Sequence, residues 1–106
     1  MTFKLKRSNN SAEHFEPLTL GEIKVSIQAS QFHYCTPRRT LSSSDSYTTF
    51  EVALMKNGDW YHPEKDDKFA NTSWAKYWSE HDDVAATVPR EEVAKMLTDL
   101  NSTFNN

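Results

Sequence analysis

The amino-acid sequence predicts an α+β fold: a small antiparallel sheet of three to five strands, with a C-terminal helix packed on one face and a short Trp-rich helix. Three observations lead to this prediction. Apolar and polar residues alternate over 23–29, a second alternating run ends at Asn57-Gly58, and apolar residues recur at helical spacing over 93–100. A length of 106 residues leaves room for one domain and one core.

The first 21 residues have the least regular pattern. Phe3 and Leu5 alternate with lysines, which is consistent with a short edge strand, but the polar run 8–11 interrupts this alternation. We therefore expect three parts: a partly ordered N-terminal arm over 1–21, a single α+β domain over 22–100 and a flexible tail over 101–106.

The clearest strand pattern begins after Glu22. β-branched residues alternate with Lys, Ser and Gln over 23–29, which is typical of a half-buried strand. This strand leads directly into the segment 31–39, where Pro37 ends regular pairing and a Ser-rich loop follows. A loop placed by a rigid strand is where proteins often carry recognition residues.

A second strand and a hairpin follow the Ser-rich loop. The alternation over 47–55 predicts the strand, and Asn57-Gly58 favours a type I′ turn. A two-residue turn sets Lys56 opposite Asp59 and Met55 opposite Trp60. Both pairs are favourable, because one joins opposite charges and the other joins methionine to an aromatic ring.

The C-terminal half predicts two helices and a short strand. Trp74, Tyr77 and Trp78 share one helical face, which indicates one or two turns of helix. A short apolar strand is expected over 84–88. The final helix is expected over 89–100, because a proline and two glutamates suit its start and apolar residues form a stripe along it.

The net charge of −3 is unevenly distributed along the chain. Residues 1–40 carry six Lys/Arg and three Asp/Glu, whereas residues 41–106 carry six and twelve. Direct nucleic-acid binding is not expected of an acidic chain, because phosphate contacts dominate that affinity. An acidic surface can instead dock onto a basic protein that itself binds nucleic acid.

The single cysteine excludes an internal disulfide and is consistent with a reducing cytoplasm. No apolar run approaches the roughly 18 residues of a membrane span, and the basic N-terminus lacks the apolar stretch of a signal peptide. We therefore expect no contact with a membrane.

Catalysis and metal binding are not expected. Cys35 could act as a nucleophile helped by His33, but no cysteine-hydrolase signature surrounds it, and a buried structural cysteine is the alternative we favour. No metal and no other cofactor is expected, because the close paired spacing of structural zinc sites is missing. The residues considered as ligands are His14, His33, Cys35, His62 and His81.

The segment 31–39 is the first candidate binding site. Adjacent guanidinium groups beside aromatic rings suit a carboxylate, a phosphate or a nucleotide. The alternative is that one arginine points into solvent and the other pairs with the acidic half of the chain. The residues expected to contact a partner here are Phe32, His33, Tyr34, Arg38 and Arg39.

The aromatic residues between 60 and 78 form the second candidate. Core packing is the default for rings at helical spacing, but six large rings exceed what a short helix and a hairpin must bury. We expect one or two of them to stay exposed beside acidic residues, as anchors for another protein. The expected contact residues are Trp74, Tyr77, Trp78, Glu80, Asp82 and Asp83.

Three short motifs resemble a known group of proteins. They are Tyr-Cys-Thr-Pro-Arg at 34–38, Tyr-x-x-x-Glu-Val at 47–52 and Val-Pro-x-x-x-Val at 88–93. Over residues 23–100 this pattern resembles small bacteriophage-encoded accessory proteins, mostly of unassigned function. The chain departs from the pattern in its longer N-terminal arm and in the Trp-rich segment 69–78.

The resemblance implies a phage or prophage accessory protein that acts in the host cytoplasm. Small phage proteins without catalytic motifs are often inhibitors of host machinery, including anti-CRISPR proteins. We therefore expect a non-catalytic counter-defence inhibitor, whose partner is a host protein or ribonucleoprotein complex with a basic groove that the acidic half covers.

Two further possibilities follow from the residues themselves. The protein could be a sponge for a nucleotide signal, with Arg38 and Arg39 gripping phosphates and Tyr34 or Phe32 stacking on a base. Exposed aromatic residues would also permit a symmetric homodimer.

Overall fold

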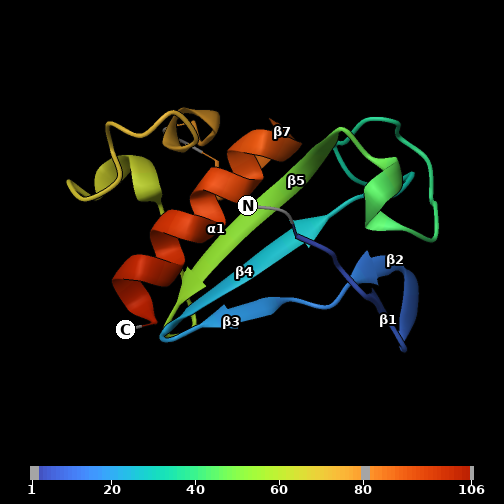
Figure 1. Ribbon diagram of the computed structural model, residues 1–106, viewed down its shortest axis with the longest axis horizontal. Helices are drawn as coiled ribbons and strands as arrows, with labels where there is room; N and C mark the ends of the chain where they lie inside the picture. Colours follow the sequence, from blue (N-terminus) through green and yellow to red (C-terminus); the bar gives the residue numbers. More distant parts are fainter. Residues whose placement is uncertain (1–2, 80–81, 106) are drawn as a thin grey trace.

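The computed structural model describes residues 3–79 and 82–105, which form a two-layer α+β fold (Figure 1). Helix α1 lies across one face of a twisted antiparallel sheet. The elements in chain order are β1 (Arg7–Ser8), β2 (Ser11–Phe15), β3 (Leu18–Leu20), β4 (Ile23–Gln28), the 3₁₀ turn η1 (Ser44–Ser46), β5 (Thr49–Lys56), β6 (Asp59–Trp60), the 3₁₀ turns η2 (Pro63–Lys65) and η3 (Ala75–Tyr77), β7 (Val84–Pro89) and α1 (Arg90–Phe104). The predicted fold class is confirmed.

The main sheet has five strands and is centred on β5. Strands β3, β4, β5 and β6 are neighbours in that order, and β7 pairs with the same edge of β5 as β6 does, further along the strand. Every pairing is antiparallel. Strands β1 and β2 form a separate two-stranded hairpin at the side of the sheet (Figure 1).

The hairpin between β5 and β6 has the register that the sequence predicts. Lys56 pairs with Asp59, and Met55 pairs with Trp60. Asn57 and Gly58 both have positive φ, 53° and 87°, as a type I′ turn requires. Because successive side chains alternate between faces, this register places Trp60 on the same face of the sheet as Met55.

We expected the segment before β4 to be a partly ordered arm outside the domain, but part of it packs into the core. Phe15 is buried in the core, and its backbone N–H and C=O are both bonded by the side chain of Gln28. The backbone N–H of Leu5 donates to Ser44 Oγ at 3.0 Å. The polar run 8–11 forms a hairpin turn, which is the physical reason that the alternation breaks there.

Helix α1 is longer than predicted and includes residues that we assigned to a flexible tail. It begins at Arg90, directly after Pro89, and it ends at Phe104 instead of Leu100. The ring of Phe104 contacts Tyr61 at 6.1 Å between centroids. Gly21 permits the close approach of this end of the helix, because a Cβ there would lie 1.9 Å from the Phe104 carbonyl oxygen.

The Trp-rich helix is only a single 3₁₀ turn, η3, instead of one or two α-helical turns. Its flanking tryptophans are core residues: Trp74 is 1% exposed and Trp78 is 3% exposed. Backbone bonds from Tyr77 to Trp74 and from Trp78 to Ala75 close the turn. The aromatic spacing therefore reflects packing against α1 and β7 and not a longer helix.

One hydrogen bond in the segment between β6 and η3 makes stability depend on pH. The Tyr61 hydroxyl donates to Asp66 Oδ2 at 2.6 Å. This bond, followed by the backbone N–H of Lys68, lowers the pKa of Asp66 below its ordinary value of 3.8, while burial raises the pKa of Tyr61. A carboxylate whose folded pKa is depressed stabilises the fold above the unfolded pKa, and this stabilisation is lost as the pH falls through the folded pKa.

We expect the melting temperature to fall as the pH is lowered below 3.8, the ordinary pKa of an aspartate, and Asp66→Asn to reduce the steepness of that fall. Melting curves across this range measure the effect. Asp67→Asn is the matched control, because Asp67 is an exposed neighbour. Equal acid sensitivity in the wild type and Asp66→Asn would show that the Tyr61–Asp66 bond contributes nothing.

Candidate functional site

The sheet has one covered face and one uncovered face. Core side chains of β4 and β5, such as Val25 and Val52, point toward α1 and are fully buried. On the opposite face, Ala53 lies between Ser26 of β4 and Val84 of β7, in the middle of the sheet. These three residues remain partly exposed, so no described element covers the centre of this face.

A groove of about 620 Å³ lies at one side of the uncovered face. Two of its lining residues are large exposed rings: Tyr34 is 57% exposed and Trp60 is 49% exposed. Carboxylates supply most of its polar groups. The lining residues are Tyr34, Glu51, Trp60, Asp82, Asp83, Val84 and Ala86.

Backbone pairing holds the ring of Tyr34 at the groove. The N–H of Tyr34 donates to Glu51 Oε2 at 2.8 Å, and its carbonyl accepts from the N–H of Thr87 at 3.1 Å. The next bridge along the chain joins Thr36 to Thr49 of β5. The segment after β4 is therefore fixed to both β5 and β7, with Tyr34 beside Glu51.

The acidic residues of the groove are only partly engaged by the protein. His62 Nε2 lies 2.8 Å from Asp83 Oδ1, and the Ser79 hydroxyl donates to Asp82 Oδ2 at 2.6 Å. No lysine or arginine is among the residues that line the groove. The groove is thus a negatively charged hollow with apolar and aromatic walls.

The other predicted residues of the loop have different positions. Phe32 is exposed but does not line the groove, Arg39 is exposed, and His33 is buried. The guanidinium of Arg38 lies 5.0 Å from the centroid of the Tyr34 ring, and its Nε donates to the carbonyl of Gln31. Arg38 is therefore engaged by its own loop, and phosphate binding by Arg38 and Arg39 stays a prediction.

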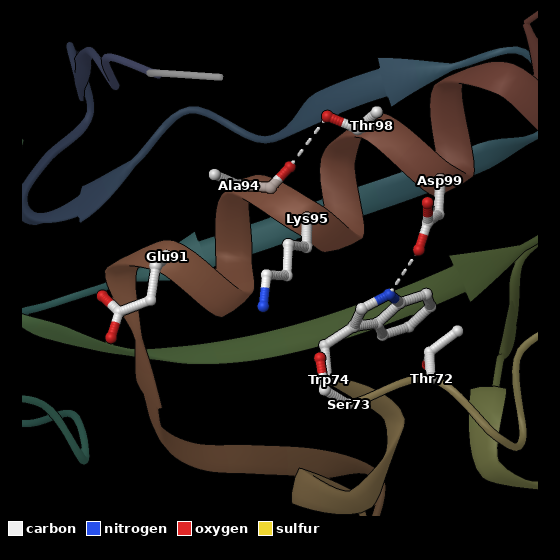
Figure 2. A pocket seen from close by; sticks show the side chains of 8 residues that line it. All are labelled: Thr72, Ser73, Trp74, Glu91, Ala94, Lys95, Thr98 and Asp99. Carbon is white, nitrogen blue, oxygen red and sulfur yellow. Dashed lines mark hydrogen bonds between the residues drawn. The ribbon is translucent and has the colours of Figure 1, made fainter.

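Trp74 and Trp78, which we expected to contact a partner, are instead buried. Figure 2 shows Trp74 beneath α1, where its indole N–H donates to Asp99 Oδ2 at 2.8 Å. A hollow of about 550 Å³ lies here between α1 and residues 72–74. Tyr77 is partly exposed, and its ring lies 5.6 Å from the Nζ of Lys76.

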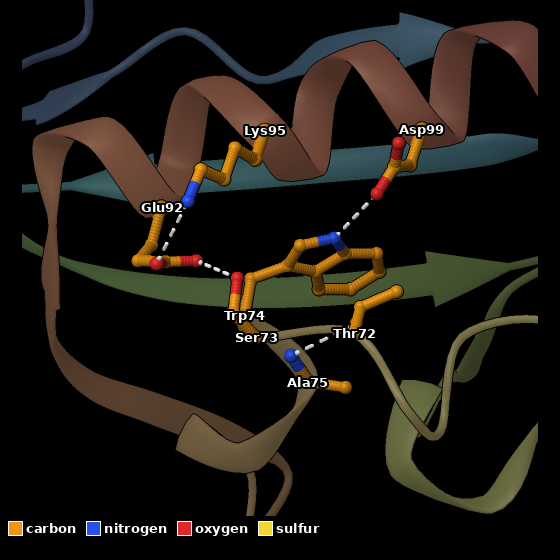
Figure 3. A network of polar contacts seen from close by, with 7 residues as sticks. All are labelled: Thr72, Ser73, Trp74, Ala75, Glu92, Lys95 and Asp99. Atoms are coloured by element: carbon orange, nitrogen blue, oxygen red, sulfur yellow. Dashed lines mark hydrogen bonds and ion pairs between the residues drawn. The ribbon is translucent and has the colours of Figure 1, made fainter.

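A polar network fixes residues 72–75 against α1 (Figure 3). The Ser73 hydroxyl donates to Glu92 at 2.6 Å, and Lys95 pairs with the same carboxylate at 3.5 Å. The N–H of Ala75 donates to the Thr72 hydroxyl. This network shows that Trp74 and its neighbours hold the two segments together, which is a structural role.

The groove thus brings together three residues that we expected to contact a partner and four that we did not name as contacts. Tyr34, Asp82 and Asp83 were expected contacts. Trp60 belonged to the aromatic group that formed the second candidate, although it was not named as a contact, and Glu51, Val84 and Ala86 were not considered. Strand alternation could have indicated Glu51 and Trp60, because it places both side chains on the face of the β5–β6 hairpin opposite the buried apolar residues. Glu80 lies outside the described residues.

Cys35 and His33 both contact Ser30 and are not arranged as a nucleophile and a base. The Cys35 thiol donates to the Ser30 carbonyl at 3.3 Å, while His33 Nδ1 lies 2.6 Å from Ser30 Oγ. Burial raises the pKa of Cys35 and lowers the pKa of His33. The thiol is therefore protonated at neutral pH and is a weak nucleophile.

We expect an alkylating probe at pH 7 to label Cys35 at least about tenfold more slowly in the folded protein than in denaturant, because the thiol is buried and protonated. Mass spectrometry of the labelled chain measures both rates. Labelling of the folded protein as fast as that of the unfolded chain would contradict the buried, inert thiol.

Comparison with known proteins adds no family to this description: no family model, no curated protein and no solved structure matches the chain. Within residues 3–79 and 82–105, no helix has the length and apolar character needed to cross a membrane. In the same residues, no group of three or more His, Cys, Asp or Glu side chains is placed to hold a metal ion.

Proposed function

We propose that this protein is a non-catalytic accessory protein of the phage type, which binds and inhibits a host defence complex in the host cytoplasm. The observation that carries the proposal is the uncovered sheet face, with two large rings exposed at its acidic groove. Aromatic residues are enriched at the centres of protein–protein interfaces, so two exposed rings that line one groove support a binding role.

The rigidity of the groove supports a binding role. The backbone of Tyr34 is tied to β5 and β7, and pairing with Met55 places the backbone of Trp60 at the edge of the sheet. A backbone that is held in place before binding does not have to be ordered when a partner covers the rings that it carries. Such rings are the residues that most often dominate binding energy at an interface.

The charge of the groove supports a partner with a basic surface. Glu51, Asp82 and Asp83 line it, and no lining residue is basic. Complementary charge raises the rate of association and selects among partners. Proteins and ribonucleoproteins that handle nucleic acid carry basic surfaces, so an acidic face of this kind can cover the surface that a nucleic acid would otherwise use.

The arrangement of Cys35 supports a non-catalytic role. Its thiol is buried and donates to a backbone carbonyl, and the imidazole of His33 is engaged by the hydroxyl of Ser30. A cysteine nucleophile needs an exposed, readily ionised thiol beside a base. Inhibition by stoichiometric binding requires none of this chemistry.

The test is capture from cells that carry active defence systems. The tagged protein is expressed in such a host, purified by its tag, and the recovered proteins are quantified. We expect one host protein or complex in near-equal amounts, and we expect expression to raise the plating efficiency of a phage that the defence system restricts. A failure of both readouts across several defence-proficient hosts would overturn the proposal.

A further inference from the structure

The uncovered sheet face offers acceptor atoms that the protein itself does not use. Glu51, Asp82 and Asp83 each have one carboxylate oxygen bonded, by Tyr34, Ser79 and His62 respectively. Among the described residues, no donor contacts the second oxygen of these three carboxylates. Each can therefore accept hydrogen bonds from a partner without giving up an existing contact.

The rings beside these carboxylates are suited to a cation. A positive charge over an aromatic face is attracted by the ring quadrupole, and the attraction is strongest for tryptophan. The chain already contains one example in this loop, since the guanidinium of Arg38 lies 5.0 Å from the Tyr34 ring centroid. Within the described part of the chain, no cation lies over the ring of Trp60, although nearly half of its surface is accessible.

We propose that the groove receives an arginine side chain from a basic segment of the partner, which docks on the uncovered face. This inference rests on the proposed function, because it names the chemistry of the partner at the same site. The guanidinium would contact the ring of Trp60, which carries no cation from the described residues, and donate to the free oxygens of Glu51, Asp82 and Asp83.

Arginine fits this site better than lysine for two physical reasons. The guanidinium is planar and weakly hydrated, so it stacks on a ring while its edge donates to carboxylates. An ammonium is compact and strongly hydrated, and it loses more hydration when it enters an apolar hollow. A phosphate or a nucleic acid is disfavoured, because the lining residues carry only negative formal charge.

The test uses three heptapeptides of glycine and serine that carry a central arginine, lysine or citrulline, each capped at both ends. Citrulline keeps the shape of arginine but removes the charge. The indole N–H resonance of Trp60, assigned with the Trp60→Phe variant, is followed in ¹⁵N-labelled protein. We expect saturable shifts with the arginine peptide, affinity about threefold lower with lysine and at least about tenfold lower with citrulline.

Two matched variants decide whether the groove is the site. Glu51→Gln keeps an acceptor for the Tyr34 N–H but removes one charge, and we expect about threefold weaker binding of the arginine peptide. Asp45→Asn removes an exposed carboxylate outside the groove, and we expect no change. Equal binding of arginine and citrulline peptides, or equal effects of the two variants, would overturn the inference.

The peptide test and the capture test can fail independently, so the arginine site and the inhibitor proposal are tested separately. Arginine-selective shifts without a captured host protein would leave the cation site standing and remove the inhibitor proposal. Capture of a host protein that depends on Trp60, combined with equal binding of the arginine and citrulline peptides, would retain the inhibitor proposal and reject arginine as the occupant.

Discussion

Replacement of Arg90 by methionine is expected to lower the free energy of unfolding by about 3 kcal/mol. The guanidinium of Arg90 donates to the carbonyl of Tyr47 at 2.7 and 3.1 Å and also to the carbonyl of Ser44. Both residues are buried, so these carbonyls cannot turn to water when the donor is removed. Methionine retains the apolar stem and the helix propensity, which confines the loss to the charged group.

Ring contacts add to the expected effect of Arg90. Its guanidinium carbon lies 5.2 Å from the ring centroid of Phe3 and 5.0 Å from that of Phe50. Because these residues come from the N-terminal segment and β5, one side chain at the start of α1 joins three distant parts of the sequence. Replacement of Arg90 should therefore lower the free energy of unfolding by more than replacement of a surface arginine does.

Urea denaturation of the wild type and the variant measures this prediction. Arg39→Met is the control, because Arg39 is exposed, and its change should stay within about 0.5 kcal/mol. If Arg90→Met and Arg39→Met proved equally stable, the account of α1 as anchored through Arg90 would be wrong.

Replacement of Trp60 by alanine is expected to weaken binding of the captured partner by at least about 30-fold, equivalent to about 2 kcal/mol. Trp60 supplies the largest exposed ring of the groove, and alanine removes both its contact area and its cation-binding face. The fold should lose little, because the side chain is half exposed and β6 is a short edge strand.

Phe32→Ala is the control for Trp60→Ala. Phe32 is also a large exposed ring, but it does not line the groove, so its removal should change affinity by no more than about twofold. Titration calorimetry with the captured partner gives both values. A larger effect of Phe32→Ala than of Trp60→Ala would move the binding surface to the tip of the 31–39 segment.

Local pattern was sufficient for the elements that depend on near neighbours. The β5–β6 hairpin follows from Asn57-Gly58, because positive φ at both positions fixes the turn and hence the register. The strand at 23–28 and the C-terminal helix follow from their periodicity. Each of these signals is contained in about a dozen consecutive residues, because the repeat of a strand or a helix sets which neighbouring positions are apolar.

Elements that depend on distant partners could not be predicted in the same way. The N-terminal segment is ordered by Gln28, Ser44 and the core around Phe15, and no local pattern indicates these contacts. The extension of α1 to Phe104 depends on the aromatic residues at 61 and 69, which pack on its last turn. Long-range packing, and not propensity, decides these ends.

Only part of the candidate site could be predicted, because the site also depends on contacts between residues that are distant in the sequence. Tyr34, Asp82 and Asp83 stood out by composition, but their meeting with Glu51 and Trp60 depends on β7 pairing with β5. Trp74 was misassigned because a tryptophan at helical spacing looks the same in sequence whether it faces solvent or, as here, Asp99 on α1.

The measurement that tests the central claim most directly is photo-crosslinking in the host cell. A benzophenone amino acid is placed either at Lys24, which lies on the uncovered face opposite Met55, or at Lys95, which lies on α1. Both lysines are exposed, and the contact that Lys95 makes is a 3.5 Å pair with Glu92 on the surface of α1, so neither replacement should disturb the core. We expect a crosslinked host protein from position 24 and none from position 95; crosslinking from position 95 alone would show that the uncovered sheet face is not the binding surface.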